Sequence, residues 1–261
     1  MAQGLTEFLP VSSSGHLALL QRVLGYDLGP SMTFVSVMLH FGTLIALCIV
    51  FYKDIFALFK KPFKPLLMLI AATVPAGVIG LLFNDKINAL FEGAQGLLYL
   101  AICFACTAAM LLICEIVAKR RKKHAQLSWR HAVPMGLAQA VALFPGISRS
   151  GSTIVAGTVS GAKGEDVAKF SFLMSIPVIL GSVLVELFGF IKEPPQLAGG
   201  TNATLALVLG IVIGVTVAAI SGLFAIKAML KIIGKANYKW FSLYLVLLSM
   251  TCFWLNALQI L

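Results

Sequence analysis

The sequence contains few charged residues. Only 11% of its 261 residues are Asp, Glu, Lys or Arg, whereas a soluble domain usually carries about 25%. Hydrophobic residues account for 59% of the chain, and the mean hydropathy is +0.97. This composition argues against a soluble globular domain and predicts a protein whose main solvent is lipid.

Two sequence patterns are also absent. The N-terminus lacks a basic stretch followed by an apolar core and a small-residue cleavage site, so we expect no secretory signal peptide. Neither the glycine spacing of a Walker A loop nor that of a dinucleotide-binding turn occurs, so a nucleotide cofactor has no support.

Six segments without Asp, Glu, Lys or Arg are long enough, or nearly so, to cross a bilayer. They are residues 33–52, 65–83, 97–114, 170–185, 204–226 and 241–261. The cysteines all lie in these apolar segments, so we expect them to pack rather than to form disulfides or bind metal. They are Cys48, Cys103, Cys106, Cys114 and Cys252.

Lysine and arginine outnumber the acidic residues by twenty to ten, a balance that could indicate nucleic-acid binding. Most of these basic residues, however, gather in alternate connections between the apolar segments, at residues 53–64, 119–130 and 227–239. By the positive-inside rule, this pattern predicts that both termini lie outside. It makes the basic excess a signal of membrane topology, and we expect no nucleic-acid partner.

Two further apolar segments, residues 1–24 and 131–161, are interrupted by Pro, Gly and Ser, as re-entrant helix pairs are. They match each other at a constant offset of 136 residues, which pairs Gln3 with Gln139 and Gly15 with Gly151. We therefore predict an all-α polytopic membrane protein with six transmembrane helices plus two re-entrant half-helix pairs. The pairs belong to two repeats, residues 1–130 and 131–261. Because each repeat crosses the membrane three times, the second is inverted, and the polar site is expected near the midplane.

The first interrupted segment combines a carboxylate, hydroxyls and an imidazole. Glu7 is the only acidic residue of either interrupted segment, and Ser12, Ser13, Ser14 and His16 follow it. An ionisable group at membrane depth costs about 2.5–3.5 kcal/mol or more, so it marks a functional site by default. The alternative is that Glu7 only caps the second half-helix or lies at the membrane interface.

The second interrupted segment places Arg149 among small hydroxyl residues at an expected helix N-terminus. Backbone N–H groups, the positive end of the helix dipole and a bidentate guanidinium together predict an anion site. Arg149 could also pair with Glu7 to stabilise the fold, and the two interpretations are compatible. His40 stands alone in an apolar segment, where packing or hydrogen bonding is favoured over a role as a ligand.

These two motifs resemble those of the bacitracin-resistance family of undecaprenyl-diphosphate phosphatases. The family motifs are Glu/Gln-Gly-x-x-Glu-Phe-Leu-Pro-x-Ser-Ser-[Ser/Thr]-Gly-His and Pro-Gly-x-Ser-Arg-Ser-Gly-x-Thr, which residues 3–16 and 145–153 satisfy. The resemblance implies hydrolysis of undecaprenyl diphosphate to undecaprenyl phosphate and phosphate, which recycles the lipid carrier for cell-wall synthesis and confers bacitracin resistance. It also implies an inner-membrane protein, often a homodimer, whose site opens to the periplasm or exterior, assisted by a divalent cation, Mg²⁺ or Ca²⁺.

Carried over by position, the resemblance implies roles for nine residues. The catalytic residues are Glu7, Ser13, His16 and Arg149; those around the diphosphate are Ser12, Ser14, Ser148, Arg149, Ser150 and Thr153. Glu7, with Gln3 nearby, is the candidate metal ligand, and Gln3 replaces a carboxylate of the family motif. Family members usually have an apolar half-helix before the first motif, whereas only Met1 and Ala2 precede Gln3 here. The start is therefore truncated or misassigned, or the first helix pair is incomplete.

The expected reaction leaves the nucleophile open. Ser13, activated by His16 or Glu7, is preferred; direct attack by His16, or by an activated water, is the alternative. A different class of protein also fits, because inverted repeats with helix ends at the midplane are typical of transporters. A flippase for polyprenyl phosphate or a carrier of another anion would need Arg149 but has less use for an adjacent base and hydroxyl.

Overall fold

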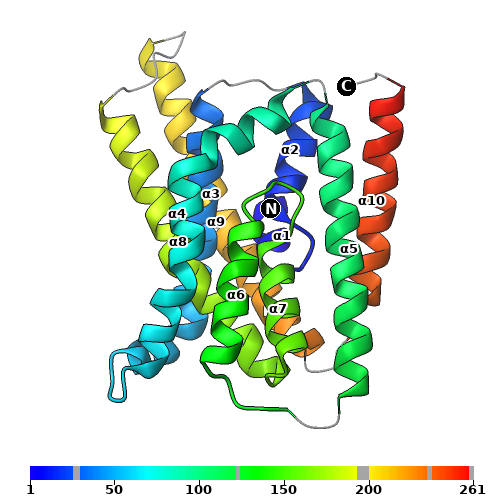
Figure 1. Ribbon diagram of the computed structural model, residues 1–261. Helices are drawn as coiled ribbons and strands as arrows, with labels where there is room; N and C mark the ends of the chain where they lie inside the picture. The colour runs from blue at the N-terminus through cyan, green and yellow to red at the C-terminus, as the bar shows by residue number, and fades with distance from the viewer. Residues whose placement is uncertain (26–29, 94, 122–123, 193–199, 234–236, 259–261) are drawn as a thin grey trace.

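The computed structural model describes residues 1–25, 30–93, 95–121, 124–192, 200–233 and 237–258, and these fold into helices joined by short connections (Figure 1). The helices are α1 (Ala2–Phe8), α2 (Ser13–Leu24), α3 (Pro30–Leu58), α4 (Lys64–Glu92), α5 (Gly96–Arg120), α6 (Trp129–Val141), α7 (Arg149–Ser160), α8 (Gly164–Lys192), α9 (Gly200–Ile233) and α10 (Lys239–Ala257). No strand occurs among these described residues.

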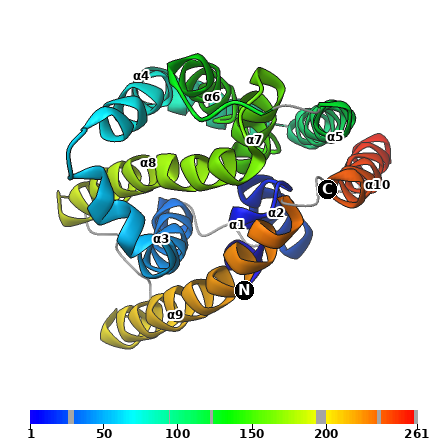
Figure 2. The same ribbon diagram turned by 90° about the horizontal axis from the view of Figure 1, so that it is seen from below.

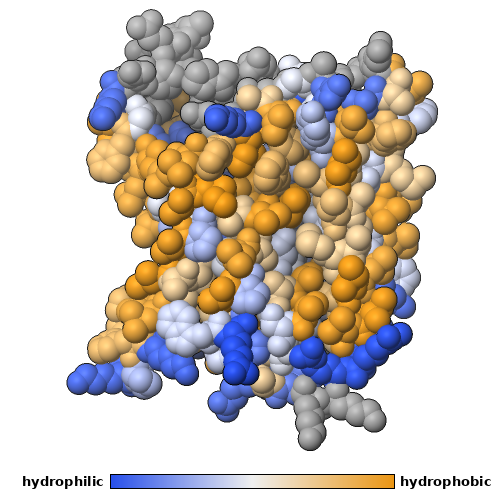
Figure 3. All heavy atoms as spheres, in the orientation of Figure 1, coloured by the Kyte–Doolittle hydropathy of each residue, from blue (hydrophilic) through white to orange (hydrophobic). Residues whose placement is uncertain are grey.

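Six of the helices are long and apolar enough to cross a membrane. The stretches are Phe34–Leu58, Lys64–Phe83, Gly96–Arg120, Gly164–Gly189, Leu205–Ile233 and Lys239–Ala257. Large hydrophobic side chains point outward from them, among them Leu81 and Phe224. Figure 3 shows the resulting apolar belt between two more hydrophilic ends. The prediction of an all-α polytopic membrane protein with six transmembrane helices is therefore confirmed.

The two interrupted segments form helix pairs whose turns lie near mid-height in Figure 1. Figure 2 shows α1 and α2 inside the bundle and α6 at its outer edge beside α4. α2 occupies the space between the middle and one end of the molecule, while α6 and α7 lie between the middle and the other end. The turn between α1 and α2 thus meets the turn between α6 and α7 well inside the bundle. Re-entry of these pairs into a bilayer stays a prediction.

The helix bounds follow the offset found in the sequence. Both α2 and α7 have 12 residues, and the start of each lies 136 residues from the other, at Ser13 and Arg149. Each ends at a glycine in the left-handed conformation, Gly25 with φ 63° and Gly161 with φ 106°, where a side chain would be strained. The division at residue 130 into two inverted repeats stays a prediction that these matched bounds support.

Glycine allows the two turns to touch. A Cβ atom built on Gly15 would lie 2.8 Å from the Cα atom of Gly146 and 2.8 Å from the ring of Phe104 on α5. A side chain at Gly15 would therefore force the turns apart. This close approach brings the motif residues of the two helix pairs to one place.

The basic connections gather at one end of the molecule. The α3–α4, α5–α6 and α9–α10 connections all lie at the lower end in Figure 1, and they carry the lysine and arginine clusters. Residues 122–123 and 234–236 of these clusters lie outside the described residues. The alternation expected from the sequence is thus present in space.

Candidate functional site

Both turns end in a serine that caps the following helix. The hydroxyl of Ser12 accepts from the Gly15 N–H at 3.3 Å, and that of Ser148 accepts from the Gly151 N–H at 3.0 Å. These are equivalent positions at the 136-residue offset. The Ser12 hydroxyl also accepts from the backbone N–H of Gly146 at 3.1 Å, so it binds the two turns directly to each other. Such caps satisfy N–H groups that a helix start leaves unpaired.

Glu7 lies at the junction of the two turns and is only 7% exposed. Its Oε1 accepts from Nη2 of Arg149 in an ion pair. Its Oε2 accepts from the Gln3 amide at 2.9 Å and from the Ser13 hydroxyl at 2.5 Å. One buried carboxylate therefore contacts both the candidate nucleophile and the candidate phosphate ligand. A hydroxyl that donates to a buried carboxylate can lose its proton to it when it attacks.

A cavity of about 210 Å³ opens beside this carboxylate. Seven of the nine predicted site residues line it: Glu7, Ser12, Ser13, Ser14, Ser148, Arg149 and Ser150. Apolar side chains of α3, of the turn between α6 and α7, and of α8 complete the wall, including Val37, Leu143 and Ile179. A polar floor with apolar walls suits a ligand that has an anionic head and a hydrocarbon tail.

Glu7 uses only one of the two terminal guanidinium nitrogens of Arg149. Its Nη2 binds Glu7, but its Nη1 is buried and has no hydrogen-bond partner within the described part of the chain. A buried donor without a partner is costly unless a ligand completes it. Because Arg149 also begins α7, an anion bound at Nη1 would lie close to the N-terminal end of a helix dipole.

Two predicted residues do not line the cavity. His16 uses Nδ1 to contact the carbonyl of Ser12 at 2.7 Å, and its Nε2 lies 2.6 Å from the hydroxyl of Tyr244 on α10. Thr153 is fully buried, and its hydroxyl contacts the Ser171 hydroxyl at 2.6 Å and the Arg149 carbonyl at 2.9 Å. Both side chains brace the turns from outside the cavity.

His40 is the residue that sequence reasoning missed. As expected, it is hydrogen-bonded, with Nδ1 lying 2.8 Å from the carbonyl of Ser36. Its Nε2, however, lies 3.5 Å from Oε2 of Glu7, and the ring lines the cavity. The signal in the sequence was an ionisable side chain within an uncharged span, but His40 belongs to neither motif, and only the packing of α3 against α1 places it here.

A divalent cation would find oxygen ligands at Glu7 and Gln3. The Oε1 atom of Gln3 is buried without a hydrogen-bond partner among the described residues, and carboxylate and amide oxygens suit Mg²⁺ or Ca²⁺. The described residues contain no cluster of three His, Cys, Asp or Glu side chains. These oxygens are of the type that a cation completed by water and substrate oxygens would need, but Glu7 already accepts from Gln3, Ser13 and Arg149, and Gln3 does not line the cavity.

The fold and the site define a class: a polytopic helical membrane protein with a buried carboxylate, arginine and serine around a cavity for an anion. Comparison with known families identifies the particular family to which this chain belongs. The model of the family described as Bacitracin resistance protein BacA matches residues 1–251, and the chain belongs to this family. The resemblance seen in the two sequence motifs is thereby confirmed.

Individual relatives are similar over nearly their whole length. The undecaprenyl-diphosphatase of Carboxydothermus hydrogenoformans is 40% identical over 258 residues, 98% of this chain and 95% of the relative. That of Halothermothrix orenii is 40% identical over 245 residues, 93% of this chain and 90% of the relative. That of Methanobrevibacter smithii is 38% identical over 268 residues, 94% of this chain and 90% of the relative.

Proposed function

We propose that this protein is a membrane phosphatase that hydrolyses undecaprenyl diphosphate to undecaprenyl phosphate and inorganic phosphate. This reaction recycles the lipid carrier for cell-wall synthesis and underlies bacitracin resistance. The names of its relatives support this proposal. The observation that carries it in the structure is Glu7, whose carboxylate contacts both Ser13 and Arg149 at the cavity wall.

The second helix pair binds the diphosphate in this proposal. Arg149 Nη1 donates to a phosphate oxygen, and the N-terminus of α7 faces the same charge. The Ser148 hydroxyl lies in the same wall and can add a donor, whereas the Ser150 hydroxyl already donates to the Leu9 carbonyl at 3.0 Å. The apolar wall residues Val37, Leu143 and Ile179 lead the prenyl chain from the cavity toward the bilayer.

The first helix pair carries out the phosphoryl transfer. The Ser13 oxygen attacks the terminal phosphorus while its proton passes to Oε2 of Glu7. The bond from that phosphorus to the bridging oxygen breaks, and undecaprenyl phosphate leaves. Water then attacks the phosphoserine, releases inorganic phosphate and restores the Ser13 hydroxyl. Positioned charge is what such a transition state needs, and Arg149 provides it.

The contacts of His16 favour Ser13 as the nucleophile. Both nitrogens of His16 are in hydrogen bonds that lie outside the cavity, to Ser12 and Tyr244. Direct attack by His16 would require both its ring and its partners to move. Attack by water activated at Glu7 is the remaining alternative, and variants of Ser13 separate the two.

We include a divalent cation in the proposal, Mg²⁺ or Ca²⁺, held by Glu7 with Gln3 nearby. When bound, it neutralises negative charge on the diphosphate. The Gln3 amide nitrogen donates to Glu7, and its unpaired oxygen would be the second protein ligand of the cation.

We further propose that the protein lies in the inner membrane as a homodimer, with both termini and the cavity toward the periplasm or exterior. The gathering of basic connections at one end supports this orientation. In a cysteine-free background, an impermeant thiol reagent applied outside should label Lys192→Cys at once. It should label Lys60→Cys, in a basic connection, only after permeabilisation. The opposite pattern would place the cavity on the cytoplasmic side. Residues 193–199 of the connection that follows Lys192 lie outside the described residues.

One measurement separates the phosphatase from a flippase or anion carrier. Purified protein in detergent has no second compartment to transport into, so a transporter releases no phosphate there. We expect phosphate release from undecaprenyl diphosphate under these conditions. Transport by reconstituted protein without any release of phosphate would favour the carrier.

A further inference from the structure

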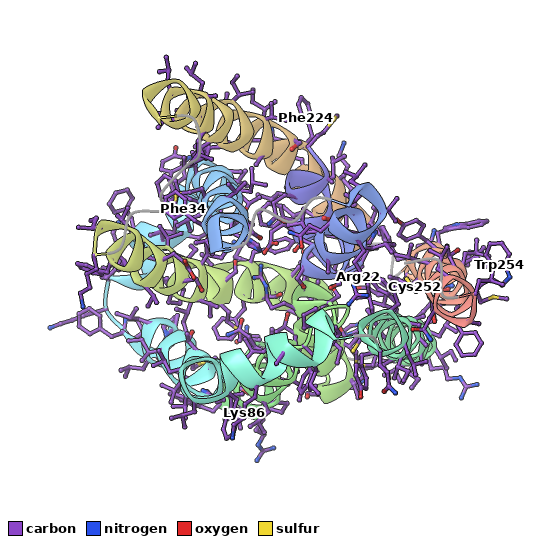
Figure 4. All side chains as sticks on the ribbon, turned by 90° about the horizontal axis from the view of Figure 1, so that it is seen from above. Arg22, Phe34, Lys86, Phe224, Cys252 and Trp254 are labelled. Carbon is purple, nitrogen blue, oxygen red and sulfur yellow. The ribbon has the colours of Figure 1, made fainter. Side chains whose placement is uncertain are left out.

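Tyr244 belongs to α10, which contributes no residue to the cavity wall. Its helix, α10, lies at the edge of the bundle and packs mainly against α5 (Figure 2). Figure 4 shows Trp254 of the same helix pointing away from the bundle. No motif of the sequence includes α10, yet Tyr244 contacts one of the predicted catalytic residues.

The contact between Tyr244 and His16 is specific in geometry. The two rings stack with centroids 5.6 Å apart and an interplanar angle of 12°, and the ring of Phe104 meets His16 edge-on at 5.7 Å. The Ser12 carbonyl can only accept a hydrogen bond, so Nδ1 of His16 carries the ring proton and donates a hydrogen bond to that carbonyl. The Nε2 lone pair of the neutral ring then accepts from the Tyr244 hydroxyl at 2.6 Å.

His16 acts on the turn that holds Ser13. Ser12 has φ 66°, in the left-handed region that is unfavourable for a serine, and the bond from His16 restrains its carbonyl. That turn directs Ser13 at Glu7 and lets the Ser12 hydroxyl accept from Gly146. A change in the His16 ring is therefore transmitted to the attacking hydroxyl.

Polar contacts hold α10 against α5, so Tyr244 has a fixed position. The hydroxyl of Ser242 donates to the Ala108 carbonyl at 2.8 Å, and that of Ser249 donates to the Ala101 carbonyl at 2.7 Å. The Glu115 carboxylate accepts from the first N–H of α10. Tyr244 lies between Ser242 and Ser249, and these bonds keep its ring on His16.

We propose that Tyr244 is a positioning residue of the active site, which fixes the neutral Nδ1–H form of His16 and through it the Ser12–Ser13 turn. The inference rests on the proposed phosphatase function. It assigns α10 a part in catalysis, and it explains how His16 can be needed for activity although it lies outside the cavity.

Tyr244→Phe tests this inference because it removes the hydroxyl and keeps the stacked ring. We expect kcat to fall about tenfold, the effect of one lost hydrogen bond, with KM close to that of the wild type. The matched control is Tyr99→Phe, which removes an exposed hydroxyl bonded to Gln95 at 3.2 Å and should leave kcat unchanged. Wild-type kcat in Tyr244→Phe would overturn the inference.

A double-mutant cycle shows whether Tyr244 acts through His16. In His16→Asn the amide can still donate to the Ser12 carbonyl, but nothing remains for Tyr244 to bind. We expect the double variant to be no slower than His16→Asn alone. Losses that multiply would mean that Tyr244 acts independently and would contradict the inference.

An ¹⁵N spectrum of histidine-labelled protein tests the bond without any activity. The Nε2 resonance that disappears in His16→Asn should shift in Tyr244→Phe and stay in place in Tyr99→Phe. An unmoved resonance would disprove the bond. If the wild type released no phosphate, the proposed function would fail, and this spectrum would still decide the role of Tyr244.

Discussion

The two helix pairs have matching serine caps but different functional side chains at equivalent positions. In both, a serine hydroxyl caps the second helix and approaches a serine two residues later, at 3.4 Å for Ser12 and 3.3 Å for Ser148. At the same 136-residue offset, however, Glu7 corresponds to Leu143 and Ser13 to Arg149. In the proposed mechanism, the first pair carries the base and the nucleophile, and the second carries the cationic side chain. Two matched helix pairs would then supply different halves of one active site.

This division of labour predicts different kinetic results in the two halves. Changes in the second pair should weaken binding of the diphosphate as well as catalysis. Changes in the first pair should act mainly on turnover. The variants below test or sharpen that comparison.

Arg149→Lys should have the largest effect in the binding half. A lysine retains the charge, but its compact ammonium lacks the planar fork whose two nitrogens can contact Glu7 and a phosphate oxygen at the same time. We expect kcat/KM to fall about a hundredfold, with a rise in KM that separates this variant from those of the first pair. The matched control, Arg130→Lys, changes an exposed arginine at the start of α6. Near-normal KM and kcat in Arg149→Lys would make Arg149 a structural counter-charge only.

Variants of His40 test whether residues outside the first helix pair contribute to turnover at Glu7. His40→Leu removes the polar group beside Glu7, and we expect kcat to fall about tenfold. His40→Gln can place an amide near the same position and should keep most of the activity. Steady-state phosphate release compares the two. Wild-type activity in His40→Leu would show that the contact between His40 and Glu7 has no consequence for turnover.

The smallest effect is expected at Thr153, which lies outside the cavity. Thr153→Val removes the hydroxyl bonded to Ser171 while it keeps the shape of the side chain. We expect about 1 kcal/mol of lost stability and little change in KM. Thermal unfolding in detergent measures the first quantity. A rise in KM at unchanged stability would instead support the direct contact with diphosphate that the family motif implies.

Much of this architecture could be predicted from the sequence. The length of uncharged segments revealed the spans, and the constant offset revealed the two interrupted pairs. Glu7, Ser13 and Arg149 could be identified because charge and hydroxyls are rare at membrane depth. All three residues line the cavity.

The remaining contacts depend on packing between distant helices. His40 of α3 and Tyr244 of α10 reach the site across the bundle, and neither periodicity nor motif spacing predicts which helices become neighbours. The sequence also does not predict the directions in which the side chains of His16 and Thr153 point. The ring of His16 turns toward α10, while Thr153 lies one helical turn after Arg149 and directs its hydroxyl back to the Arg149 carbonyl.

The most direct test of the central claim compares Ser13→Ala with His16→Ala in the purified protein, by phosphate release from undecaprenyl diphosphate. If Ser13 attacks and Glu7 takes its proton, Ser13→Ala abolishes hydrolysis, whereas His16→Ala keeps slow turnover because Glu7 still contacts the serine. Hydrolysis by Ser13→Ala at the wild-type rate would contradict the account outright. A dead His16→Ala with a trappable phosphohistidine would transfer the attack to His16.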